Sequence, residues 1–141
     1  MLKKTREILS KLSLRQKAAI LTGKDCWSTL EIEEVGLPSV KMSDSPNGIR
    51  MPGCDTDVIP SACALASSFS VDTARRAGEL LGSEFKNAGL DLILGPAMNL
   101  KRSPLCGRNF EYYSEDPHLS GEMAAAFVLG AQEHVGCCVK H

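Results

Sequence analysis

The strongest constraint on the fold is an amphipathic helical segment that leads directly into a short aliphatic run. From Ser70 onward, apolar and small residues recur every three or four positions and so share one face of a helix: Val71, Ala74, Gly78, Leu81, Phe85 and Ala88. Ser70 has the side chain of a good N-cap, and Gly89 fits the position that ends a helix. The run 90–94 is then closed by a Gly-Pro pair, which predicts a strand covered on both faces.

The same order of elements occurs a second time. Asp116 and Pro117 fit the N-cap and the first position of another helix. Its apolar and small residues again share one face: Leu119, Met123, Phe127, Gly130 and Ala131. Gly136 and the short run 137–139, a further buried strand, follow. Strand, helix and strand in this order require parallel strands with right-handed crossovers, so the predicted fold class is α/β.

Two short helices are predicted at the start of the chain, over residues 2–12 and 14–22. Ser13 precedes the second helix and Gln16 follows three positions later, which is the pattern of a capping box. Gly23 fits the stop position of that helix.

A third strand is predicted at 39–43, and polar residues follow each of the three strands. Asp44 follows this strand, the loop 96–115 follows the next, and Lys140–His141 follows the last. The loop combines aromatic residues with arginine and carboxylates, which favours a structured binding loop over a disordered one. The carboxyl ends of parallel strands meet at one edge of a sheet, so we expect these groups to form one site.

The charge balance excludes binding by a basic surface. Sixteen Lys and Arg residues stand against 17 Asp and Glu, with a net charge of -1, so we expect neither a nucleic-acid nor a membrane partner. No stretch reaches the roughly 18 apolar residues of a membrane span, and the first twelve residues fit an amphipathic helix better than a secretory signal. We therefore expect a cytoplasmic protein.

The six cysteines show no metal-binding or redox pattern. They contain no C-x-x-C pair and no histidine at ligand spacing, so we expect no metal and no cofactor. We interpret most of them as small buried thiols. The only tryptophan, Trp27, suits either the core or a position that lines a ligand pocket with its ring face.

Four segments of the chain carry motifs that belong together. Residues 103–117 read SPLCGRNFEYYSEDP, and residues 42–50 read MSDSPNGIR. The first is similar to a signature of glycoside hydrolase family 3, in its β-glucosidase branch, and the second resembles that family's early Ser-Asp-Gly-Pro-(His/Asn)-Gly-(Leu/Ile)-Arg segment. Residues 139–141 resemble its Lys-His-Phe segment, and residues 12–27 its N-terminal helix and Trp loop. The resemblance spans nearly the whole chain in the right order.

The resemblance implies a fold and an activity. It implies that residues 1–141 form one partial domain, the N-terminal portion of a (β/α)8 TIM-like barrel, since a complete barrel takes about 200–250 residues. It implies a parent enzyme that hydrolyses terminal non-reducing β-D-glucosyl residues with retention. The nucleophilic aspartate and the acid/base glutamate of the family belong to segments that this chain does not contain. We therefore expect no catalytic residue here and no turnover by residues 1–141 alone.

The resemblance also assigns four substrate-binding residues, Asp44, Arg108, Lys140 and His141. Asp44 would accept hydrogen bonds from vicinal hydroxyls of a terminal sugar ring, and the other three would donate to the remaining hydroxyls. The implied partner is a β-glucoside or a short oligosaccharide. Ser45 stands where the family usually has glycine, and a serine at positive φ would cost about 1 kcal/mol or relax the loop beside Asp44.

Residue chemistry alone leaves other roles open for the same side chains. Asp44 also suits a turn, Arg108 an ion pair with Glu111 or Glu115, and Lys140–His141 a frayed chain end. Two other functions also stay open. One is the β-N-acetylhexosaminidase branch of the same family, and the other is a non-catalytic sugar-binding or interaction fragment. The oligomeric state is not constrained.

Overall fold

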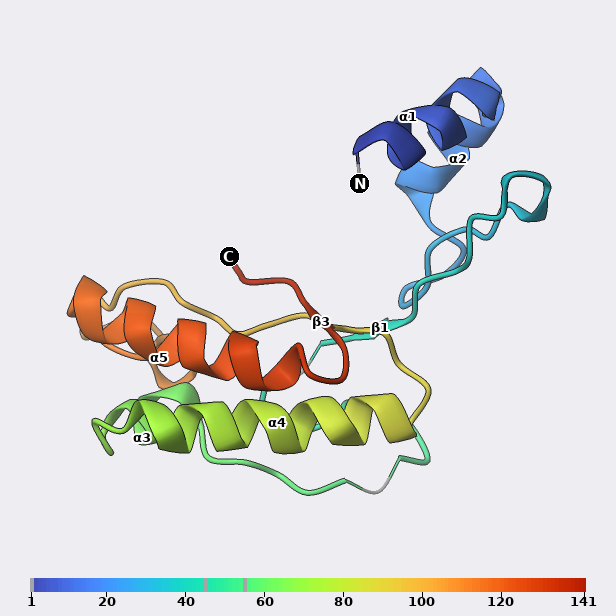
Figure 1. Ribbon diagram of the computed structural model, residues 1–141. Coiled ribbons are helices and arrows are strands. Elements are labelled where there is room, and N and C mark those ends of the chain that lie inside the picture. Colours follow the sequence, from blue (N-terminus) through green and yellow to red (C-terminus); the bar gives the residue numbers. More distant parts are fainter. Residues whose placement is uncertain (1, 45, 55) are drawn as a thin grey trace. The chain divides into compact units, whose positions relative to one another are not determined.

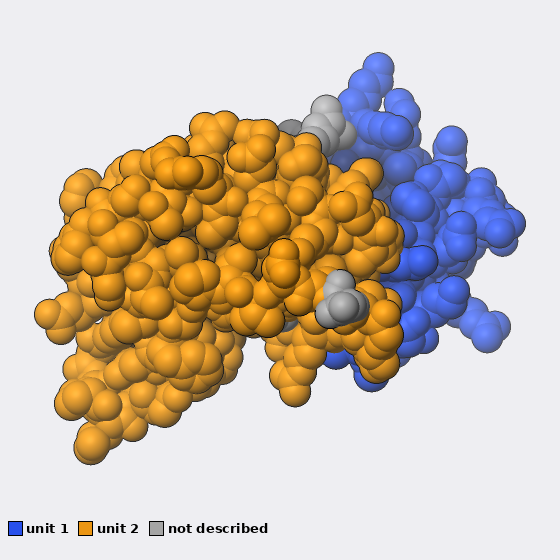
Figure 2. All heavy atoms as spheres, turned by 90° about the horizontal axis from the view of Figure 1, so that it is seen from below, with its two compact units in different colours: residues 1–42 blue, residues 43–141 orange. Residues whose placement is uncertain are grey.

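The computed structural model describes residues 2–44, 46–54 and 56–141. Within it the chain divides into two compact units, Met1–Met42 and Ser43–His141, which Figure 2 distinguishes by colour. Each unit is described by itself below. Ser45, whose replacement of a glycine bears on Asp44, lies outside the described residues.

The first unit opens with the two predicted helices, α1 (Leu2–Lys11) and α2 (Leu14–Thr22). The capping box is confirmed. The Gln16 amide donates to Ser13 Oγ at 3.2 Å, and the Ser13 amide donates to Gln16 Oε1 at 2.9 Å. Gly23 ends α2 with φ of +80°, a conformation that glycine adopts at little cost.

The rest of the first unit is a long irregular hairpin. Antiparallel bridges join Ser28 to Lys41 and Ile32 to Leu37, and the short 3-10 helix η1 (Glu33–Val35) forms its tip. Trp27 is 40% exposed. Of its two predicted roles, the one as a buried core residue is therefore wrong.

The second unit is built on a three-stranded sheet. Its strands are β1 (Met42–Ser43), whose Ser43 is the first residue of this unit, β2 (Leu92–Ile93) and β3 (Gly136–Cys137), in the order β1-β2-β3. β2 and β3 are parallel, with Leu92 opposite Gly136. The α/β class with a parallel sheet is therefore confirmed.

All three strands are shorter than predicted. At the start of the second predicted strand, the Leu90 amide bonds back to Phe85 of the preceding helix and not across the sheet. The third strand begins one residue early because the Gly136 amide donates to Asp91 O at 2.8 Å. These limits depend on pairing with distant residues, which the local pattern does not contain.

Three helices accompany the sheet: α3 (Ala62–Ala66), α4 (Val71–Asn87) and α5 (Pro117–Ala131). Both predicted N-caps are confirmed. Ser70 Oγ accepts from the Thr73 amide at 3.2 Å, and Asp116 Oδ2 accepts from the Leu119 amide at 2.7 Å. The short helix α3 was not predicted, because its five residues are too few to show a helical period.

Helices α4 and α5 lie side by side (Figure 1) and approach at the level of their backbones. A Cβ atom at Gly78 of α4 would lie 2.1 Å from Phe127 O. A Cβ atom at Gly130 of α5 would lie 2.1 Å from Arg75 O. The small residues of the predicted apolar faces therefore permit this contact.

Two groups of buried side chains form the core. One lies where β2 meets α4 and α5 and consists of Ile49, Ile59, Leu81, Phe85, Leu90, Ile93, Phe127, Ala131 and Val135. The other is centred on α3 and consists of Ala62, Leu65, Ala66, Ala74, Tyr113, Met123 and Ala124.

The cysteine prediction was wrong. Three thiols are exposed and three are half-buried, because they lie in loops, on the short α3 helix and at the edge strand rather than in the two core groups. Burial raises the pKa of Cys137 to about 11. No helix in the described part of the chain is both long and apolar enough to cross a bilayer.

Candidate functional site

Asp44 and Lys140 meet at the carboxyl-end edge of the sheet. Asp44 directly follows β1, and Lys140 lies beyond β3, where its amide donates to Pro96 O at 3.1 Å and its carbonyl accepts from the Met98 amide at 2.8 Å. The Lys140 ammonium forms an ion pair with Asp44 Oδ1. The Lys140 side chain is 17% exposed and that of Asp44 is 42% exposed, so solvent reaches the carboxylate.

The pairing that positions Lys140 contains an extra residue. Within the sheet, Ile93 lies opposite Cys137, whereas further along Ala97 lies opposite Lys140. The chain advances four positions on the first side (93 to 97) and three on the other (137 to 140). One extra residue is thus accommodated in the segment 94–96, as in a β-bulge, a device that redirects side chains beside binding sites.

His141 connects the end of the chain to the long loop. Its amide donates to Asn99 Oδ1 at 2.8 Å, and its Nε2 lies 2.6 Å from Arg108 Nη2. A guanidinium can only donate, so Nε2 accepts and a neutral ring carries its proton on Nδ1. The Tyr112 ring meets the imidazole edge to face, with centroids 5.9 Å apart. The peptide bond between Lys140 and His141 is cis.

The loop that carries Arg108 is ordered, as predicted. Its two ends are joined by a hydrogen bond from the Lys101 amide to Ser114 O at 3.2 Å. Inside it, Asn109 Nδ2 donates to Ser103 O at 2.8 Å, and the 3-10 helix η2 (Asn109–Glu111) forms one turn. Because of this turn, the Glu111 side chain lies next to that of Arg108, which is three positions earlier in the sequence.

Arg108 forms an ion pair with Glu111 through Nε. The Glu111 side chain is only 11% exposed, which fixes the carboxylate while the guanidinium reaches outward. The hydrogen bond to Glu111 is the main cause that raises the pKa of Arg108, and the negative charge of the same group adds to it. The predicted ion pair with Glu111 is therefore present, and it leaves other N–H groups of Arg108 for a ligand.

The four predicted site residues form one connected group. We call it the rim cluster, and it consists of Asp44, Lys140, His141, Arg108 and the supporting Glu111. Glu111 was foreseen as an ion-pair partner but not as part of a site. The roles of Asn99 and Tyr112 were not predicted, because both depend on contact with His141 at the far end of the chain.

The surroundings suit an uncharged polar ligand. A cavity of about 400 Å³ adjoins the cluster and is lined by Met98, Asn99, Leu100, Val139, Lys140 and His141. Arginine, lysine and carboxylate groups side by side can donate to and accept from hydroxyl groups. Over residues 2–44, 46–54 and 56–141 there is no group of three or more His, Cys, Asp or Glu placed to hold a metal ion.

Comparison with known proteins identifies relatives over nearly the whole chain. The thermostable β-glucosidase B of Acetivibrio thermocellus is 41% identical and is matched over 96% of this chain and 20% of its own length. A β-glucosidase of Rhizobium radiobacter is 40% identical over 96% of this chain and 17% of its own length. The chain thus spans about a fifth of the length of these curated relatives.

Solved structures show the same similarity. β-Glucosidase 3B from Thermotoga neapolitana in complex with glucose is 39% identical, with a TM-score of 0.90 over 98% of this chain and 23% of that one. The β-glucosidase from Kluyveromyces marxianus in complex with glucose is 40% identical, with a TM-score of 0.91 over 96% of this chain and 17% of that one. The sequence model of the glycosyl hydrolase family 3 N-terminal domain matches residues 10–141. With that match and these relatives, the chain belongs to glycosyl hydrolase family 3.

Proposed function

We propose that this chain belongs to a retaining β-glucosidase that hydrolyses terminal non-reducing β-D-glucosyl residues. In this proposal residues 1–141 form the N-terminal portion of a (β/α)8 barrel and supply part of the pocket for the terminal sugar ring. The observation that carries the proposal is the contact between Asp44, Lys140, His141 and Arg108, which come from three separate segments. The names of the relatives support the same activity.

The rim cluster can bind hydroxyl groups at two positions. Lys140 contacts Oδ1 of Asp44, so Oδ2 is the oxygen that would accept from sugar hydroxyls. Arg108 uses Nε for Glu111 and one Nη2 proton for His141, and a guanidinium has five N–H donors in all. The remaining donors would bind hydroxyls next to those that Asp44 accepts. A misplaced hydroxyl would leave one of these groups unpaired, at a cost of about 1–3 kcal/mol.

The bond-breaking step needs groups that this proposal assigns to further polypeptide. Retention requires two carboxyl groups about 5–5.5 Å apart, one as nucleophile and one as acid/base. The curated relatives are about five to six times as long as the matched region, which leaves room for both groups. We therefore expect residues 1–141 to bind sugar without turning it over.

Calorimetric titration of the 141-residue chain with glucose and its epimers tests the proposal. We expect saturable glucose binding, with galactose and mannose each weaker by about 5- to 150-fold, since one hydroxyl is misplaced in each. Aryl β-glucoside should not be hydrolysed above a mock preparation. Equal affinity for all three sugars, or no binding by a chain that circular dichroism shows to be folded, would refute the proposal. Tighter binding of N-acetylglucosamine than of glucose would point to the hexosaminidase branch.

Glu111 is expected to act as a positioning residue for Arg108. The Glu111→Gln variant keeps a hydrogen-bond acceptor but loses the charge, so Arg108 is held less firmly and the dissociation constant for glucose should rise about tenfold. The Nε2 signal of His141 should also shift in ¹⁵N spectra, which a merely structural role would not cause. Glu133→Gln, which removes the exposed ion pair with Arg75, is the matched control and should change neither value. An unchanged His141 signal would argue against this role.

A further inference from the structure

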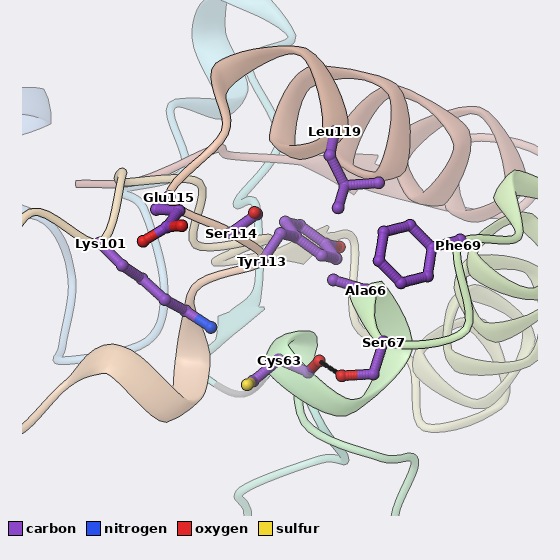
Figure 3. A pocket seen from close by; sticks show the side chains of 9 residues that line it. All are labelled: Cys63, Ala66, Ser67, Phe69, Lys101, Tyr113, Ser114, Glu115 and Leu119. Carbon is purple, nitrogen blue, oxygen red and sulfur yellow. Dashed lines mark hydrogen bonds between the residues drawn. The ribbon is translucent and has the colours of Figure 1, made fainter. Parts of the chain in front are cut away.

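A second cavity lies away from the rim cluster and shares no residue with it. It has a volume of about 310 Å³ and lies between α3, the start of α5 and the two ends of the long loop. Figure 3 shows the Phe69 and Tyr113 rings with Leu119 at one end, and Lys101 and Glu115 at the other. The cavity therefore has one apolar end and one charged end.

Phe69 contributes little to the packing of the folded chain. Its side chain is 78% exposed, and its backbone has φ of +52°, a left-handed conformation that costs a residue with a side chain about 1–2 kcal/mol. Burial of the ring does not offset this cost. Backbone conformations of this kind persist when the surrounding structure imposes them, and they concentrate at binding sites. Here the result is an aromatic face presented at the edge of a cavity.

The charged end offers one donor and one acceptor that are not paired with each other. Among the described residues, neither Lys101 nor Glu115 takes part in an ion pair, although both line the cavity. Of the nearby serine hydroxyls, Ser67 Oγ donates to Cys63 O and Ser114 Oγ accepts from the Asp116 amide, so each has part of its hydrogen-bonding capacity occupied. The ammonium and the carboxylate are thus the charged groups available to a ligand.

This combination selects for a ligand with an apolar face and hydroxyl edges. An anion would be repelled by Glu115 and a cation by Lys101, while an apolar ligand would leave both charges without a partner. A pyranose ring presents C–H groups that can pack on an aromatic face and hydroxyls that both donate and accept. The volume is at the lower end of the range for small-molecule sites, which suits a single ring.

We propose that this cavity is a second carbohydrate site, which binds one neutral sugar ring against Phe69 with hydroxyls bonded to Lys101 and Glu115. The choice of a glucosyl ligand rests on the proposed function, but the site itself does not depend on the rim cluster. Such a site would hold part of an oligosaccharide or a second sugar molecule on the same chain.

Amide chemical shifts of the ¹⁵N-labelled 141-residue chain, titrated with glucose and with cellobiose, test this proposal. We expect shifts of Ser67, Glu115 and Leu119 to follow a saturation curve distinct from that of Asn99 and Arg108. In the Phe69→Gly variant, the dissociation constant obtained from the first set of shifts should rise at least tenfold, and the one obtained from Asn99 and Arg108 should not change. Glycine tolerates the positive φ, so this variant removes the ring without straining the backbone.

Two further variants make the result decisive. Lys101→Met should also raise the dissociation constant at the second cavity. Leu129→Ala, which shortens an exposed side chain of α5 outside the cavity, should leave it unchanged. No saturable shift around the cavity, or a curve that persists unchanged in Phe69→Gly, would overturn the proposal. Asp44→Asn should raise only the dissociation constant of the rim cluster, so failure of the proposed function and failure of the second site give different results.

Discussion

The Gly130→Ala variant is expected to lose about 3 kcal/mol of its free energy of unfolding. The new Cβ would lie 2.1 Å from Arg75 O and 2.8 Å from the Glu79 amide nitrogen. Both are backbone atoms of α4, so no side-chain rotation can remove the clash. The two helices would have to move apart, and the buried side chains between them would lose contact.

Urea denaturation followed by circular dichroism measures this loss, and Gly121→Ala is its matched control. Gly121 lies in the same helix, but no atom outside its own backbone surroundings lies within 4 Å of the added Cβ. Alanine there should instead stabilise the helix by about 0.5–1 kcal/mol. If both variants changed stability by the same amount, the close approach of α4 and α5 would be wrong.

The second large effect is expected at Asp44, where Asn should weaken glucose binding by about 10- to 150-fold. The Asp44→Asn variant keeps the shape of the side chain but loses the negative charge that strengthens its hydrogen bonds, and bonds to charged groups contribute about 1.5–3 kcal/mol. The Lys140 ammonium, which is largely buried, also loses its ion-pair partner. Both changes act on the part of the pocket that would receive the sugar.

Calorimetric titration with glucose measures the affinity, and Asp72→Asn provides the control. Asp72 forms an ion pair with Arg76 on the exposed face of α4, where such pairs contribute little. We expect its glucose affinity to equal that of the unmodified chain. An Asp44→Asn chain that still bound glucose with unchanged affinity would remove Asp44 from the site and with it the main support for the proposed function.

The helices could be predicted from the sequence because the signals that form them are local. Ser13, Ser70 and Asp116 each cap a helix with a bond to the residue three positions later, so the capping pattern lies within a short stretch of sequence. The first and last residues of the strands were predicted less accurately than those of the helices. Their hydrogen bonds join residues more than 40 positions apart, such as Asp91 and Gly136.

The candidate site likewise has contacts that the sequence predicts and contacts that it does not. The convergence of Asp44 with Lys140, and of Arg108 with His141, follows from the rule that polar residues after parallel strands meet at one edge. The tertiary role of Asn99 could not be predicted, because it bonds the backbone of a residue 42 positions later. The second cavity was also not predicted, since the left-handed backbone of Phe69 has no signature in its sequence.

The additional residue between Ile93 and Ala97 has a consequence for how such chains diverge. Successive side chains of a strand point to opposite sides, so deleting one residue from 94–96 would reverse the sides to which the following residues point and would turn the Asn99 side chain away from the His141 amide. Under the proposed function, the sugar pocket then depends on the spacing of this short stretch as well as on the identity of the charged groups. We therefore expect a one-residue deletion at 94–96 to weaken glucose binding although Asp44, Arg108, Lys140 and His141 are all retained.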